Sequence, residues 1–306
     1  MRTVAALLLL LALSSPVKVV VTFPSLAEDV KLLACDQDVV YSLVPSGVDP
    51  HSYELKPEDV DKLREADLII STAHTPFEYS IREMKGELKA ELLEIPSIVM
   101  VRDNPVTGRP NYHMPIYDPQ NYVLFMESLK SAMSRLNPSC REEYEAKYRE
   151  IKSRVESLMR KARSLNLSMK ALATTPLVQY AVEWTGIEVK YLILKEAGVP
   201  ATPQDLMRIK RAAQKGEIQV VILMEGEPPQ IEEKAMEIAS EYNIPYFKVP
   251  SPLKPEPIPD KLEEILQRVQ NMERSEERGL TDQVTIVGMF VLMGLILLAL
   301  WKLSRD

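Results

Sequence analysis

The chain has 306 residues, a formal net charge of -7 and 26% charged residues. This length suffices for one large or two ordinary domains. The acidic balance, without a basic patch interleaved with aromatic residues, argues against nucleic acid as a partner.

The first residues have the pattern of a secretory signal peptide. Arg2 supplies positive charge, and Val4–Leu13 is an apolar segment too short to span a bilayer well. Small residues follow it, so we expect cleavage near Ser14 and assign residues 1–15 to the signal. A first buried strand or an uncleaved anchor is the alternative. No cysteine comes directly after the apolar segment, which argues against a lipoprotein anchor.

Strands and helices are expected to alternate through the first half of the chain. A long proline-rich loop, residues 102–119, precedes the last helix of this half. Such alternation is typical of a parallel sheet covered on both faces, so we predict an α/β domain over residues 16–137. The predicted strands are residues 17–22, 39–44, 67–71 and 98–101, and the predicted helices are residues 26–33, 57–66, 78–93 and 120–136.

One long charged helix is expected next, at residues 140–165. Its apolar positions recur every three or four residues, from Tyr144 to Met159, so one face should be buried. In the middle of the chain such a helix, assigned to residues 138–166, is suited to connecting two domains. A short dimerising coiled coil is the alternative.

The alternation resumes in the second half, which predicts a second α/β domain over residues 167–272. The fold class is therefore α/β: two domains with central parallel sheets, joined by one long helix. The predicted strands are residues 171–174, 219–224 and 246–249, and the predicted helices are residues 176–185, 203–215, 230–243 and 261–272.

The C-terminal part predicts a membrane anchor. After a polar linker, residues 273–283, comes the predicted transmembrane helix at residues 284–302, which is apolar and uncharged up to Trp301 and about as long as a membrane helix needs to be. Arg305 follows, and positive flanks favour the cytoplasmic side, so the body should lie outside the cytoplasm. A buried core helix is the alternative. In that oxidising exterior Cys35 and Cys140 could form a disulfide or remain two separate buried thiols.

Each of the three histidines lies in a loop between a predicted strand and the next helix. These residues are His51, His74 and His113. Loops of this kind gather at the carboxyl edge of a parallel sheet, where ligands bind, and neutral imidazole is a common metal ligand. Each also has a plainer interpretation: a helix cap for His51, an exposed loop residue for His74 and a packed loop residue for His113.

The segment GVDPHSYEL, followed by KPEDVDKLREADLII, resembles the zinc/manganese-type (cluster A-I) solute-binding proteins of ABC importers. The segment NYHMPIYDPQN is similar to the second ligand motif of that family. The resemblance implies that His51 and His113 bind metal between two α/β domains joined by a long helix. It also implies an ABC permease as partner.

The second half departs from the family pattern. Thr175 stands where the family usually has a third ligand, and its last carboxylate has no clear match here. His74 could supply a third nitrogen, and Glu225 or Glu227 an oxygen from across the cleft, unless these glutamates are merely solvated loop charges. Three nitrogens and a carboxylate would suit zinc, whereas manganese prefers more oxygen.

We therefore predict a membrane-anchored, extracytoplasmic, monomeric receptor that binds zinc, or alternatively manganese, for an ABC permease. No catalysis is implied. A metallohydrolase would need a carboxylate near bound water, for which Asp49 and Asp118 are the candidates. A further alternative is a surface adhesion or interaction protein, or a receptor for another solute, on the same scaffold with a degenerate metal site.

Overall fold

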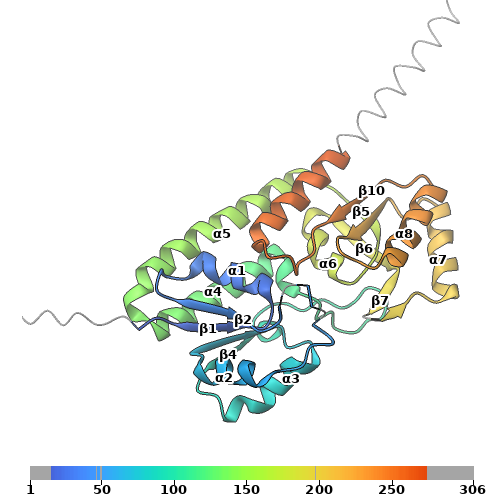
Figure 1. The fold of residues 1–306 in the computed structure, drawn as a ribbon. Coiled ribbons are helices and arrows are strands. Elements are labelled where there is room, and N and C mark those ends of the chain that lie inside the picture. The colour runs from blue at the N-terminus through green and yellow to red at the C-terminus, as the bar shows by residue number, and fades with distance from the viewer. Residues whose placement is uncertain (1–14, 46, 49, 197, 274–306) are drawn as a thin grey trace, which may run out of the picture.

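The computed structural model describes residues 15–45, 47–48, 50–196 and 198–273 (Figure 1). Two four-stranded parallel sheets form the centres of two halves, in the strand orders β2-β1-β3-β4 and β10-β9-β5-β6. The prediction of two α/β domains with parallel sheets is confirmed. The predicted signal, linker and membrane span, at residues 1–14 and 274–302, lie outside the described residues. Within the described part, no helix is long and apolar enough to cross a bilayer.

The first sheet is built from short apolar strands, each followed by a helix. Several helices begin with proline, which fits the first helical turn because its missing N–H is not needed there. The strands are β1 (Lys18–Val21), β2 (Val39–Ser42), β3 (Leu68–Ser71) and β4 (Glu91–Glu94), and the helices are α1 (Pro24–Leu33), α2 (Pro57–Glu65), α3 (Pro76–Glu83) and α4 (Pro119–Leu136).

The fourth strand is not where the sequence predicted it. The predicted strand at residues 98–101 is wrong, and β4 overlaps the end of the segment predicted as helix 78–93. Pairing with β3, in the register Leu68 to Glu91, overrides the helical preference of this charged segment. The backbone of Met100 instead bonds to the side chain of Asn121, which takes the place of a strand ladder.

The second sheet contains a strand that the sequence analysis missed. This strand, β6 (Ile187–Leu192), pairs with β5 and leads into a small antiparallel hairpin. The remaining elements of this half are β5 (Met169–Ala173), α6 (Leu177–Val182), β7 (Leu194–Glu196), β8 (Val199–Pro200), α7 (Pro203–Gln214), β9 (Val220–Met224), α8 (Pro229–Glu241), β10 (Tyr246–Val249) and a last helix at residues 258–273. Short 3-10 turns occupy Met84–Gly86, Ile95–Ser97, Pro115–Tyr117, Pro138–Cys140 and Glu183–Thr185.

Helix α5 (Arg141–Ser164) runs along one side of both halves, beside the last helix (Figure 1). Its apolar face is buried within the chain, and Arg154 forms ion pairs with Asp260 and Glu263 of the last helix. One continuous hydrophobic core joins the two sheets through α1, α4, α5 and the last helix. Separate smaller cores lie under α2 and α3 and under α7 and α8.

Cys35 and Cys140 form a disulfide, with Cα atoms 6.5 Å apart. This resolves the two possibilities that the sequence left open. Because Cys35 follows α1 and Cys140 precedes α5, the bond fixes the first helix of the chain to the start of the long helix.

Candidate metal centre

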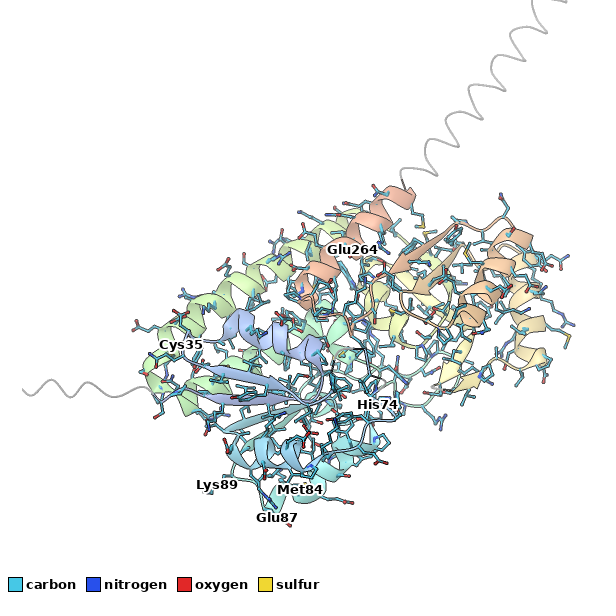
Figure 2. All side chains as sticks on the ribbon, in the orientation of Figure 1. Cys35, His74, Met84, Glu87, Lys89 and Glu264 are labelled. Carbon is cyan, nitrogen blue, oxygen red and sulfur yellow. A yellow bond between two sulfur atoms is a disulfide. The ribbon has the colours of Figure 1, made fainter. Side chains whose placement is uncertain are left out.

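The structure brings all three histidines together at the carboxyl edge of the first sheet. The ring centroids of His74 and His113 are 4.4 Å apart, and those of His51 and His74 are 5.5 Å apart. His74 lies at the side of the first sheet that faces the second half (Figure 2). The three rings line one cavity of about 60 Å³, which Leu177 and Leu253 close from the second half.

Glu78 holds the loop that carries His74. Its carboxylate accepts hydrogen bonds from the backbone N–H groups of Thr72, His74 and Thr75 at 2.7–3.0 Å, and from three hydroxyls, those of Ser71, Thr72 and Thr75. These bonds hold the pKa of Glu78 below its usual range against the effect of burial. The loop is therefore fixed tightly, including the left-handed backbone of Ala73 at φ 51°.

Asn111 sets the orientation and the tautomer of His113. Its Oδ1 accepts from the backbone N–H of His113 at 3.1 Å and lies 3.0 Å from Nδ1 of the ring. An amide oxygen cannot donate, so Nδ1 carries the proton and Nε2 offers its lone pair. Metal-bound histidines are typically oriented by such a partner on the other ring nitrogen.

The electrostatic setting keeps two of the rings neutral. Burial, together with the neighbouring histidines, lowers the pKa of His113 to about 3, and burial and His51 lower the pKa of His74. Neutral imidazole is the form that binds metal. The Nε2 atom of His74 is buried and has no hydrogen-bond partner. The donor set therefore fits a divalent transition metal.

The rings are gathered but not yet closed around one point. Within the described ranges, the one set of three metal-binding residues with donor atoms all within 4.8 Å is Cys35, Cys140 and Glu143. Those cysteines are joined in the disulfide and offer no thiolate. Zinc needs nitrogens about 2.0–2.1 Å away, so the imidazoles have to rotate inwards to hold it.

No described residue of the second half supplies a carboxylate to this cavity. Glu225 pairs with Lys254 at 2.5 Å and with Arg268 at 2.7 Å. Glu227 has both carboxylate oxygens buried and without a hydrogen bond, and burial raises its pKa. The hydroxyls of Thr174 and Thr175 and the backbone of Met224 oppose that rise, without reaching hydrogen-bond geometry. Neither glutamate lines a cavity that the histidines share.

The second half instead positions the loop of His113. The hydroxyl of Tyr180 accepts from Arg102 N–H at 2.8 Å and donates to the carbonyl of Asn111 at 2.7 Å. The amide of Asn111 donates to the carbonyl of Pro176 and to Gln179, both at 2.9 Å. One half thus carries the histidines, and the other fixes the loop that bears the third of them.

The carboxylates considered for metallohydrolase chemistry do not form a base at this site. Asp118 caps α4 by accepting from Gln120 and Asn121, and it pairs with Arg102 at 2.8 Å. Asp49 lies outside the described residues. No described carboxylate lines the cavity of about 60 Å³ that the three rings share.

Sequence reasoning missed Glu78 and Asn111. The capping-box spacing from Thr75 to Glu78 was a readable signal, because a threonine followed three residues later by glutamate marks a helix start. Asn111 carried no such signal, since its partners Pro176 and Gln179 lie 65 and 68 residues further along the chain.

A family model described as zinc-uptake complex component A, periplasmic, matches residues 19–270. The manganese ABC transporter substrate-binding lipoprotein PsaA of Streptococcus pneumoniae is 26% identical over 151 residues, which are 46% of this chain and 48% of that protein. The iron ABC transporter substrate-binding lipoprotein MtsA of Streptococcus pyogenes is 24% identical over 163 residues, 50% of this chain and 52% of that protein. The chain thus spans about half the length of the curated relatives it matches.

Solved structures share the fold. A periplasmic metal binding protein from Candidatus Liberibacter asiaticus superposes with a TM-score of 0.70 at 18% identity, over 84% of this chain and 99% of that one. A mutant of the laminin-binding adhesin Lmb from Streptococcus agalactiae superposes with a TM-score of 0.66 at 20% identity, over 81% and 98%. At these identities the likeness extends to the fold alone.

Proposed function

Because the chain belongs to the family of zinc-uptake complex component A, we propose that it is the extracytoplasmic receptor of an ABC importer for a divalent transition metal. The family consists of substrate-binding proteins of ABC transporters and not of enzymes, as the sequence analysis expected. Zinc is our first choice of cargo, and manganese the second.

The observation that carries this proposal is the convergence of all three histidines on one cavity. His113 presents Nε2 because Asn111 occupies Nδ1, and His74 presents a buried Nε2 without a partner. His51 completes the set at the rim, where it lines the same cavity. Three imidazole nitrogens favour zinc over an oxygen-preferring ion.

We propose that the histidines capture the ion without Glu225 or Glu227. Releasing Glu225 would break two ion pairs, and Glu227 lies outside the cavities that the histidines line. We further propose that the chain is a monomeric receptor that delivers the ion to an ABC permease, in support of which stands its membership of a family of ABC substrate-binding proteins. The predicted anchor at residues 284–302 lies outside the described part and remains a prediction.

Calorimetric titration of zinc, and separately of manganese, into the metal-free chain tests the proposal. We expect one-to-one binding of zinc at sub-micromolar concentration. His51→Ala, His74→Ala and His113→Ala should each weaken it at least tenfold, about 1.4 kcal/mol. Glu225→Gln and Glu227→Gln are the controls and should leave the affinity unchanged.

Two outcomes would contradict the proposal. If all three histidine variants bind zinc with the affinity of the wild type, the site lies elsewhere. If neither metal binds, the scaffold no longer carries a metal site. The adhesion protein or receptor for another solute then becomes the better interpretation.

A further inference from the structure

A second, much wider cavity opens directly outside the three histidines. We call it the outer chamber; its volume is about 500 Å³, and besides the histidines it is lined by Tyr79, Tyr112, Arg109, Glu196 and two prolines. A bare ion needs far less room, since even a water molecule takes up only about 30 Å³. Cavities of roughly 300–1,000 Å³ are typical of sites for small organic molecules.

The side chains around the histidines would not neutralise the positive charge of a bound metal ion. Three imidazoles would hold a divalent cation without neutralising it, and no described carboxylate lines the 60 Å³ cavity. The carboxylate that lines the outer chamber, Glu196, already faces Arg109. Buried charge of one sign is costly unless an opposite charge accompanies it. An anion from outside the protein can supply that charge and occupy the open coordination position.

The outer chamber has the groups to hold such an anion. The Arg109 side chain is 71% exposed, and its closest acidic partner, Glu196, lies 3.8 Å away. Glu196 is itself shared, because its Oε1 also accepts from Asn104 at 3.2 Å and Thr107 at 3.3 Å. A guanidinium with such a long ion pair keeps donors that can bind a carboxylate in a bidentate manner.

Two aromatic rings complete the chamber. Tyr79, on α3, is 47% exposed, and Tyr112, next to His113 in the sequence, is 40% exposed. The ring of Tyr112 lies 6.4 Å from that of His74. Exposed tyrosines offer both an apolar face and a hydroxyl, which suits a small polar organic molecule.

We propose that the chain takes its metal together with a small carboxylate-bearing chelator. One carboxylate of the chelator completes the coordination of the metal by the histidines, and the remainder occupies the outer chamber against Arg109 and Tyr112. This inference rests on the proposed function, because the chelator reaches the protein through the same ion.

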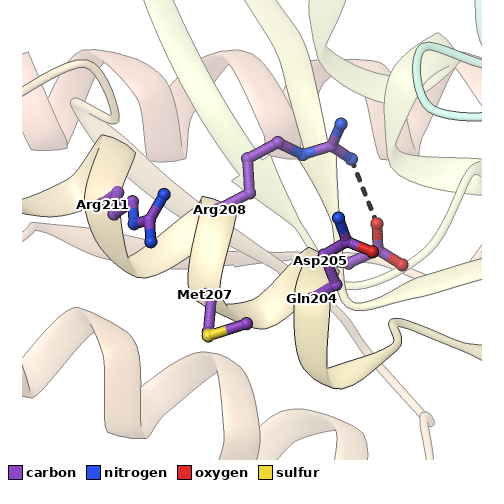
Figure 3. A pocket seen from close by; sticks show the side chains of 5 residues that line it. All are labelled: Gln204, Asp205, Met207, Arg208 and Arg211. Atoms are coloured by element: carbon purple, nitrogen blue, oxygen red, sulfur yellow. Dashed lines mark hydrogen bonds and ion pairs between the residues drawn. The ribbon is translucent and has the colours of Figure 1, made fainter.

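A hollow of similar size on α7 provides a matched control. Its volume is about 480 Å³, and it is lined by Gln204, Asp205, Met207, Arg208 and Arg211 (Figure 3). It contains arginines but no histidine, so it should not respond to metal. Arg211→Ala therefore removes a cation from a comparable hollow without affecting the outer chamber.

Equilibrium dialysis with radiolabelled citrate, at saturating zinc and in its absence, tests the inference. We expect the zinc-loaded chain to retain one citrate and the metal-free chain to retain none. Arg109→Ala should weaken citrate retention by the zinc-loaded chain at least tenfold, about 1.4 kcal/mol. Arg211→Ala should match the wild type.

The outcomes separate this inference from the proposed function. If zinc binds alone but the loaded chain retains no citrate, or citrate strips the zinc, the chelator inference fails and the receptor stands. If citrate is retained but Arg109→Ala binds it as the wild type does, its placement in the outer chamber is overturned. If zinc binds neither alone nor together with citrate, the proposed function fails and the chelator inference fails with it.

Discussion

Asn111 shows how much of the candidate site depends on one uncharged side chain. Its Oδ1 fixes His113, and its Nδ2 reaches across to Pro176 and Gln179 in the second half. The same amide thus orients a metal ligand and joins two halves of the chain. Loss of this partner should change the metal site without removing any ligand.

Asn111→Leu keeps a similar volume but removes the acceptor of His113. We expect metal affinity to fall by about 10-fold or more, because the ring loses its fixed tautomer and orientation. Gln179→Leu is the control: it removes one of the contacts of Asn111 across the halves but leaves Oδ1 of Asn111 in place, and should bind metal normally. Calorimetry gives the affinities, and circular dichroism checks that both variants fold. Equal affinity in Asn111→Leu and the wild type would contradict this role.

The histidines were accessible to sequence reasoning because their signal is local. Each is a rare residue in a loop that follows a strand, and the parallel arrangement brings such loops together at one edge of the sheet. The surroundings of Glu225 could not be predicted in this way, because Lys254 and Arg268 lie 29 and 43 residues further on. Which carboxylates are paired depends on packing between distant elements.

At the scale of elements, a long helix could be predicted from its apolar periodicity, whereas a short charged strand could not be predicted from its sequence. The helix at α5 was predicted within a residue or so, since its apolar positions recur over 24 residues. Strand β4, with the sequence ELLE, has only four residues and two charges. Its strand conformation comes from pairing with β3, which no local pattern reveals.

The disulfide between α1 and α5 should contribute substantially to stability. It closes a loop over a sequence separation of 105, which restricts the unfolded chain strongly. We expect the variant with Cys35→Ser and Cys140→Ser to unfold with a free energy lower by about 2–5 kcal/mol. Urea denaturation followed by circular dichroism measures the difference.

A reducing agent separates the disulfide from the substitutions themselves. It should destabilise the wild type towards the value of the double serine variant and leave that variant unchanged. If neither the reductant nor the double substitution lowers the free energy of unfolding, the bond does not contribute to stability.

On the scale of the whole molecule, a buried pair of titratable groups connects the first helix to the last. Asp29 of α1 accepts from the hydroxyl of Tyr122 at 2.8 Å and from Ile258 N–H at 2.9 Å. Lys261 of the last helix donates to the carbonyls of Pro252 and Lys254 at 2.9 and 2.7 Å. The two groups therefore lie where the C-terminal segment meets the first half.

Burial shifts both groups towards their neutral forms. It raises the pKa of Asp29 to about 7, with Asp260 adding to the rise and Tyr122 and Lys261 opposing it. Burial also lowers the pKa of Lys261 to about 8, against the attraction of Asp29, Glu256 and Asp260. Both groups therefore have folded-state pKa values near neutrality.

We expect these groups to give opposite slopes of stability against pH. Between about pH 4 and 7 the folded state keeps a proton on Asp29 that the unfolded state releases, so the free energy of unfolding should fall as pH rises. Between about pH 8 and 10.5 the unfolded state binds a proton that Lys261 has released in the folded state, so the free energy of unfolding should rise with pH. Their joint contribution is smallest between about pH 7 and 8.

Substitutions separate the two slopes. Asp29→Asn should flatten the acidic side of the profile and Lys261→Met the alkaline side, in urea denaturation at a series of pH values. An unchanged acidic slope in Asp29→Asn would show that the carboxyl does not hold its proton in the folded state.

The contact between Asp29 and Ile258 also determines when the first half can be finished. The two residues are separated by 229 positions, and Tyr117 likewise donates its hydroxyl to the carbonyl of Pro250. At a synthesis rate of about 5–20 residues per second, α1 emerges roughly 10–50 s before the residue that covers its carboxyl. The half that carries the histidines is therefore synthesised first, but its buried contacts are completed only once residue 258 has been made. A chain that terminates before residue 258 would leave the carboxyl of Asp29 uncovered.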